Sequence, residues 1–151
     1  MKKIILVIVA VMILISCKNN RAVTPAQPVE GTWRLITGML IENGDTVVTD
    51  YTKSVSFIKI INKTHFAFLL HDLNSGKDST AAFTAGGGRY TLDNDTYTEH
   101  LEYCTAREWE GNDFSFTVRV SADSLVQTGI EKIEGQGVDR LNIEKYVRVT
   151  E

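Results

Sequence analysis

The stretch GTWRLITGMLIE, residues 31–42, indicates the architecture of the whole chain. In a β-strand, successive side chains point to opposite faces. On that alternation, one face carries Trp33, Leu35, Thr37, Met39 and Ile41, and the other carries Thr32, Arg34, Ile36, Gly38 and Leu40. A long strand that opens with a Trp and follows a proline-containing segment is typical of the first strand of a small β-barrel.

The chain beyond Glu30 continues as short β-rich segments separated by turn residues, without an amphipathic helix. Asn43-Gly44 is a strong hairpin signal. Further strands are expected at residues 46–51, 55–62, 64–71, 79–84, 89–92, 96–104, 113–120, 125–130 and 140–150. A meander of about eight to ten strands must close or leave exposed edges. The sequence therefore predicts an all-β, antiparallel up-and-down β-barrel, which can hold one small ligand.

Composition narrows the kind of protein. The 151 residues leave room for one domain, which we expect to be monomeric. The net charge is -3 and the chain has no basic run, so we expect no nucleic-acid partner. There are only 2 cysteines, Cys17 and Cys104, so a disulfide framework would require these two to pair.

The first 17 residues are typical of a bacterial lipoprotein signal peptide. Lys2 and Lys3 precede an apolar run over residues 4–15, which is shorter than the roughly 20 residues that span a bilayer. The run ends in Leu-Ile-Ser-Cys17, which resembles the lipobox. The resemblance implies cleavage before Cys17, lipidation of its thiol and anchoring in the membrane. An uncleaved anchor or a plain secretory signal is the alternative.

Residues 18–29 read as a flexible tether that contains both prolines, Pro25 and Pro28, and residues 30–151 as the barrel domain. Acidic residues do not follow Cys17 directly. We therefore expect the protein in the cell envelope, on the periplasmic side of the outer membrane. With Cys17 lipidated, Cys104 has no partner.

The motif Gly31-Thr32-Trp33 resembles the G-x-W motif of lipocalins in the calycin superfamily. That resemblance implies that Arg148, near the end of the last strand, packs across Trp33 in a cation–π contact that closes the barrel. Together with residues 64–68, 86–92 and 97–99, the motif is similar to a lipocalin-like domain of bacterial lipoproteins, a family of largely unknown function. Residues 49–51 resemble a second lipocalin motif, but that motif belongs late in the barrel and not near the second strand. A secreted-lipocalin function is therefore not carried over.

A ligand site is expected along residues 97–103, where Tyr97, Glu99, Leu101 and Tyr103 share one face. A buried Glu99 must be hydrogen-bonded or neutralised. It could anchor a ligand between the two tyrosine hydroxyls, or it could belong to a structural network with a Tyr and Arg119. Alternation with Phe114, Phe116 and Val118 points Arg119 outward.

Histidines supply weaker candidates. On the opposite face, His100, Glu102 and Cys104 could begin a metal site, although such a stripe is more often solvated. His65 could contact a ligand in the barrel, and either it or His71 could ligate a haem. We expect no metal and no cofactor.

No catalytic signature emerges, so we expect no enzyme. No helix follows Gly86-Gly87-Gly88, which favours a bulge or a bend over a phosphate loop. The expected function is a membrane-anchored barrel that binds a small hydrophobic or amphipathic ligand. The alternatives are an interaction or inhibitor module with a filled barrel, and a haem- or metal-binding barrel.

Overall fold

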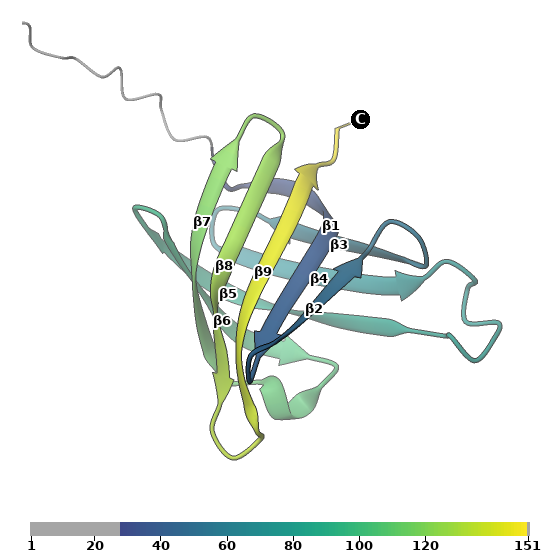
Figure 1. The fold of residues 1–151 in the computed structure, drawn as a ribbon. Helices are drawn as coiled ribbons and strands as arrows, with labels where there is room; N and C mark the ends of the chain where they lie inside the picture. The colour runs from purple at the N-terminus through teal and green to yellow at the C-terminus, as the bar shows by residue number, and fades with distance from the viewer. Residues whose placement is uncertain (1–27, 151) are drawn as a thin grey trace, which may run out of the picture.

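A computed structural model describes residues 28–150 of the chain (Figure 1). The predicted signal peptide, Cys17 and most of the predicted tether lie outside the described residues. The described chain contains one short helical turn, η1 (Arg107–Trp109), and nine strands. The strands are β1 (Gly31–Glu42), β2 (Asp45–Asp50), β3 (Val55–Ile61), β4 (His65–Asp72), β5 (Phe83–Asp93), β6 (Thr96–Cys104), β7 (Asp113–Ser121), β8 (Ser124–Ile133) and β9 (Val138–Arg148).

These strands form the closed, antiparallel up-and-down barrel that the sequence predicted. From β3 to β9 each strand pairs with the next, and β9 pairs back onto β1 to close a ring of eight. The remaining strand, β2, is extra and lies beside one end of β1 (Figure 1). One edge of β1 pairs with two different strands: residues 31–34 pair with β3, and residues 37–42 pair with β2.

A β-bulge interrupts β1 between these two segments. Leu35 pairs with Tyr146 and Thr37 with Lys145 on β9, so Ile36 is left over. One extra residue exchanges the two faces of a strand beyond the bulge. Gly38 and Leu40 therefore line the barrel interior. The uninterrupted alternation predicted from the sequence, which placed Met39 and Ile41 on the face of Trp33, is wrong beyond Leu35.

Turn chemistry and glycines shape the strands as expected. Asn43 (φ 52°) and Gly44 (φ 87°) both adopt the left-handed backbone of the tight hairpin that joins β1 to β2. The glycine run of β5 was expected to permit a bulge or a bend, and the pairing of β5 with β6 does shift there: a bulge lies opposite Gly87 and Gly88, with its extra residue on β6. A side chain at Gly88 would strike the backbone of β6, so only glycine allows the two strands to approach there.

The end of the barrel where the chain enters is closed by Trp33. Its side chain is fully buried, and its indole nitrogen donates a hydrogen bond of 2.7 Å to the Val29 carbonyl. The structure places the Arg148 guanidinium 4.0 Å from the Trp33 ring centre, where the lipocalin resemblance put it. Arg148 also donates hydrogen bonds to the carbonyls of Glu30 (2.8 Å) and Pro28 (3.1 Å). An interior site must therefore lie away from this end.

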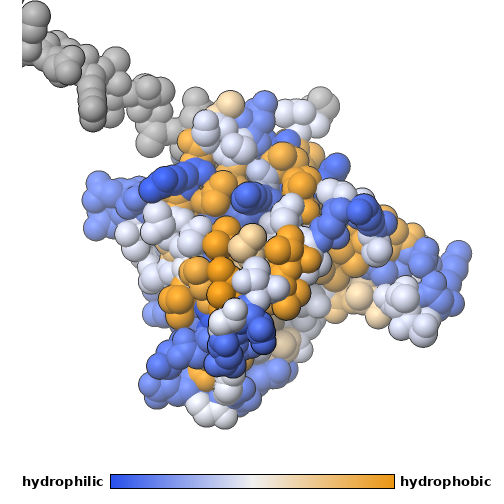
Figure 2. All heavy atoms as spheres, viewed as in Figure 1, coloured by the Kyte–Doolittle hydropathy of each residue, from blue (hydrophilic) through white to orange (hydrophobic). Residues whose placement is uncertain are grey.

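Apolar residues also gather on the outside of the barrel. Figure 2 shows them over the region where β8, β9 and β1 lie side by side. Leu141 pairs with both Ile41 and Ile130, and Ile143 pairs with Met39. The Ile130 side chain is 53% exposed. This outer surface is thus less polar than alternation in a solvated barrel would suggest.

Candidate ligand-binding site

The barrel encloses a cavity of about 270 Å³. Inward-facing side chains from all eight strands of the ring line it, together with Tyr51 and Trp109. An apolar cavity of about 150 Å³ holds one benzene ring. The cavity therefore has room for a compact molecule of one or two rings.

One wall of the cavity is aromatic. The rings of Tyr51 and Phe57 meet edge to face with 5.8 Å between their centres, and Phe57 stacks on Phe68 at 5.9 Å. These residues come from the β2–β3 connection, β3 and β4. Such a surface suits the flat, apolar part of a ligand.

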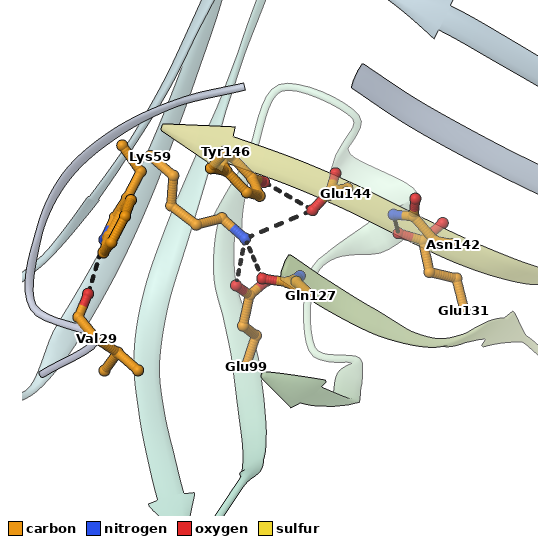
Figure 3. Close-up of polar contacts among 9 residues, drawn as sticks. Val29, Lys59, Glu99, Gln127, Glu131, Asn142, Glu144 and Tyr146 are labelled. Atoms are coloured by element: carbon orange, nitrogen blue, oxygen red, sulfur yellow. Dashed lines mark hydrogen bonds and ion pairs between the residues drawn. The ribbon is translucent and has the colours of Figure 1, made fainter. Parts of the chain in front are cut away.

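A polar group centred on Lys59 lies on the inner face as well (Figure 3). The ammonium nitrogen of this buried lysine is 2.7 Å from a Glu99 oxygen and 3.0 Å from the Gln127 side-chain oxygen. Burial lowers the pKa of Lys59, but the carboxylates of Glu99 and Glu144 outweigh it, so the net pKa is raised and the lysine stays charged. Burial raises the pKa of Glu99, and Lys59 opposes that shift.

Glu144 on β9 is another carboxylate that lines the cavity. It accepts a hydrogen bond of 2.7 Å from the Tyr146 hydroxyl. Its nearest approach to Lys59 is 3.9 Å, which is too long for a hydrogen bond. Figure 3 shows its carboxylate beside the Lys59 ammonium group, and the residue lines the cavity. Glu144 is thus held in place by a neutral hydroxyl, and it shares the Lys59 ammonium group with Glu99 at a longer distance.

The second interior ion pair joins neighbouring strands. Arg140 on β9 lies 2.7 Å from one oxygen of Glu131 on β8, and the Asn142 amide donates to the other at 2.8 Å. The Arg140 guanidinium also lies 5.3 Å from the Trp109 ring centre. Both Glu131 oxygens therefore have a partner, which satisfies this buried charge.

Two of the residues expected at a ligand site do lie inside the barrel. Glu99 is buried and lines the cavity, and its cationic partner is Lys59. Arg119, the partner considered from the sequence, is exposed on the outer face. Tyr97 is buried, but its hydroxyl has no hydrogen-bond partner within the described residues, and burial raises its pKa. It packs against Tyr90 at 5.0 Å instead of lining the cavity.

Tyr103 was expected inside and lies outside, where it is 67% exposed. The bulge between Gly87 and Gly88 explains the difference. Gly87 pairs with Tyr103 but Gly88 pairs with Leu101, so Glu102 is the extra residue of β6. Past that residue the two faces exchange, which turns Tyr103 outward and brings Cys104 to the edge of the cavity.

His65 was also expected in the barrel, and it is exposed on the outer face. Phe66 and Phe68 take the inward positions of β4, so His65 and His71 point away from the cavity. The His65 ring instead contacts the Thr64 hydroxyl at 2.8 Å. A haem held in the barrel by either histidine is not compatible with this arrangement.

The proposed metal stripe on β6 is divided among separate partners. The His100 ring lies 2.8 Å from an Asp113 oxygen, and Glu102 pairs with Arg89. Within residues 28–150, no three or more His, Cys, Asp or Glu side chains come together in a way that could hold a metal ion.

A second hollow lies on the outer surface of β4, β5 and β6. This outer groove has a volume of about 670 Å³ and a floor that includes Ala67, Leu69 and Gly87. Tyr103 and His65 both line it. Few polar groups converge on it, whereas specific ligand sites combine an apolar lining with placed polar groups. The interior cavity meets that description better.

Sequence reasoning missed Lys59, Arg140, Asn142 and Glu144. A signal was present for each. Lys59 stands in step with Phe57 and Ile61 on an otherwise apolar face of β3. Arg140, Asn142 and Glu144 stand in step with the inward Tyr146. Polar residues in the register of a core face are the expected trace of a polar cavity.

Comparisons with known proteins add little to this geometry. No protein-family model matches the chain, and no curated protein matches it. The chain is similar to a crystal structure of an uncharacterized protein from Bacteroides eggerthii, with 13% identity and a TM-score of 0.46. The match covers 80% of this chain and 98% of that one. Among the described residues, no helix has the length and hydropathy to cross a membrane.

Proposed function

We propose that this protein is a lipid-anchored barrel of the cell envelope that binds a small hydrophobic or amphipathic molecule in its interior. The cavity of about 270 Å³ carries the proposal, because its aromatic wall and convergent polar groups match what ligand sites in proteins offer. The polar groups are held in fixed positions by one another, so the site is preorganised for a ligand.

The anchor belongs to the same proposal and rests on the lipobox-like sequence that ends at Cys17. Replacement of Cys17 by Ala should release the protein from the membrane fraction. A Cys17→Ala protein that still sediments with membranes would contradict the anchor. The lipocalin-like relationship is likewise a proposal, supported by the contact between Trp33 and Arg148.

Neighbouring residues of β5 provide a test of ligand binding. Thr84 lines the interior cavity, and Ala85 lines the outer groove on the other face of the strand. Thr84→Trp fills the interior, whereas Ala85→Trp changes only the outside. Native mass spectrometry of the protein purified from membranes in mild detergent should show a small-molecule adduct. The adduct should be lost from Thr84→Trp and kept by Ala85→Trp.

If Ala85→Trp loses the adduct and Thr84→Trp keeps it, the ligand binds in the outer groove and not in the interior cavity. A different result is that the protein carries no adduct and gains no thermal stability from any small molecule in a screen. That result would favour the alternative of a filled barrel that displays its surface to a protein partner.

A further inference from the structure

The charges that line the interior cavity are not balanced. Two cations, Lys59 and Arg140, face three carboxylates, Glu99, Glu131 and Glu144. Each cation is 2.7 Å from one carboxylate: Lys59 from Glu99, and Arg140 from Glu131. Glu144 is left to share Lys59 with Glu99 at the longer distance of 3.9 Å, so the cavity lining has one more carboxylate than it has cations.

Like Glu99, which already contacts Lys59 directly, Glu144 has hydrogen-bonding capacity to spare. The Tyr146 hydroxyl donates to one of its oxygens, and among the described residues its other oxygen accepts no hydrogen bond. By contrast, both oxygens of Glu131 are occupied. An ionised carboxylate that is largely removed from water is stabilised most by a cation in direct contact.

Building on the proposed function, we infer that the ligand is a small amine whose cationic group pairs with Glu144 and whose apolar part lies on the aromatic wall. The rings of Tyr51, Phe57 and Phe68 form that wall, and Tyr51 lies against Gly38, which pairs with Glu144 across β1 and β9. Aromatic faces attract cations as well as apolar groups, which adds to the preference for an amine. The cavity volume limits the ligand to one or two rings.

An anionic ligand fits the same cavity poorly. Lys59 and Arg140 are the groups that would bind it, and each already contacts a carboxylate at 2.7 Å. A ligand carboxylate would have to displace one of these partners and would stand among three negative side chains. Like charges in a poorly solvated site repel each other strongly.

Three single-ring probes of similar size test the inference: 2-phenylethylamine, 2-phenylethanol and 3-phenylpropionate. At pH 7.5 they carry a positive charge, no charge and a negative charge. Calorimetric titration of the full-length protein in detergent should give the tightest binding for the amine, by at least tenfold over the alcohol. The acid should bind most weakly.

Glu144→Gln should abolish this preference by weakening binding of the amine at least tenfold while leaving the alcohol unchanged. The glutamine still offers an oxygen to Tyr146, so the cavity keeps its shape. Asp139→Asn is the matched control, because Asp139 lies on the same strand, faces outward and pairs with Lys132 on the surface. That variant should bind all three probes as the wild type does.

The failure of this inference can be told from the failure of the proposed function. If the alcohol or the acid binds more tightly than the amine, or if Glu144→Gln leaves the preference intact, a barrel ligand remains but the amine is wrong. If none of the probes binds and the native protein carries no adduct, the amine and the barrel ligand are both overturned. Thermal melts of each variant confirm that it is folded.

Discussion

The ammonium group of Lys59 on β3 lies 2.7 Å from a carboxylate oxygen of Glu99 on β6, inside the barrel and 40 residues along the chain. Both side chains are almost completely buried. A charge in that position is tolerated only while its partner is present. The pair therefore links two strands that are not neighbours in the sheet, and it places the polar part of the cavity.

Removal of one member of this pair should destabilise the protein strongly. We expect Lys59→Met to lower the free energy of unfolding by about 3–5 kcal/mol, because it leaves the Glu99 carboxylate buried without a cation. The double variant Lys59→Met, Glu99→Leu should recover much of that loss, since it buries no charge at either position. Urea unfolding followed by circular dichroism measures both. Equal losses in the single and the double variant would show that the pair is not the source of the effect.

The closed end of the barrel should depend on Trp33. Trp33→Ala removes a fully buried indole and the stack with Arg148, so we expect a loss of about 3–5 kcal/mol. Arg34→Ala, on the exposed face of the same strand, should change stability by less than about 0.5 kcal/mol. The comparison needs only melting temperatures, and an unchanged value for Trp33→Ala would refute the closure.

The glycine run of β5 should be intolerant at Gly88. A methyl group there would meet the backbone of His100 and Glu102, so β5 and β6 would have to separate. At Gly111 a methyl group would meet nothing, and only its left-handed backbone (φ 80°) opposes substitution. We expect Gly111→Ala to cost about 1 kcal/mol and Gly88→Ala clearly more. Similar melting temperatures for the two variants would contradict the role assigned to the bulge.

Stability should fall in acid partly through Asp72, which ends β4. Its carboxylate accepts backbone hydrogen bonds from Asn74 (2.8 Å), Gly76 (3.0 Å) and Ala82 (3.1 Å), and these lower its pKa. A lowered pKa in the folded state means that the stabilisation is present above the unfolded value, about 3.9, and is lost as the pH falls through the folded value.

Asp72→Asn tests this dependence. The variant should be less stable than the wild type at pH 7, and the difference should shrink as the pH falls below about 4. Thermal melts at pH 7, 5, 4 and 3 follow the difference. Asp45→Asn, on the exposed strand β2, controls for the general loss of a negative charge. A difference between wild type and Asp72→Asn that does not vary with pH would exclude the carboxylate as its origin.

The strands, their turns and the closed barrel could be predicted from the sequence because each depends on short-range patterns. Alternation of apolar and polar residues, together with signals such as Asn43-Gly44, indicates where a strand runs and where it ends. The contact of Trp33 with Arg148 at one end of the barrel was instead an expectation from the resemblance to lipocalins.

Only the tertiary structure decided which residues share the interior. Alternation assumes an unbroken strand, and the extra residues Ile36 and Glu102 each exchange the faces beyond them. A bulge is defined by how two strands pair, so neither strand reveals it alone. Tyr103 was misplaced for that reason. The partner of Glu99 was missed for a related reason. Lys59 contacts Glu99 across the barrel, and no local sequence pattern encodes that contact.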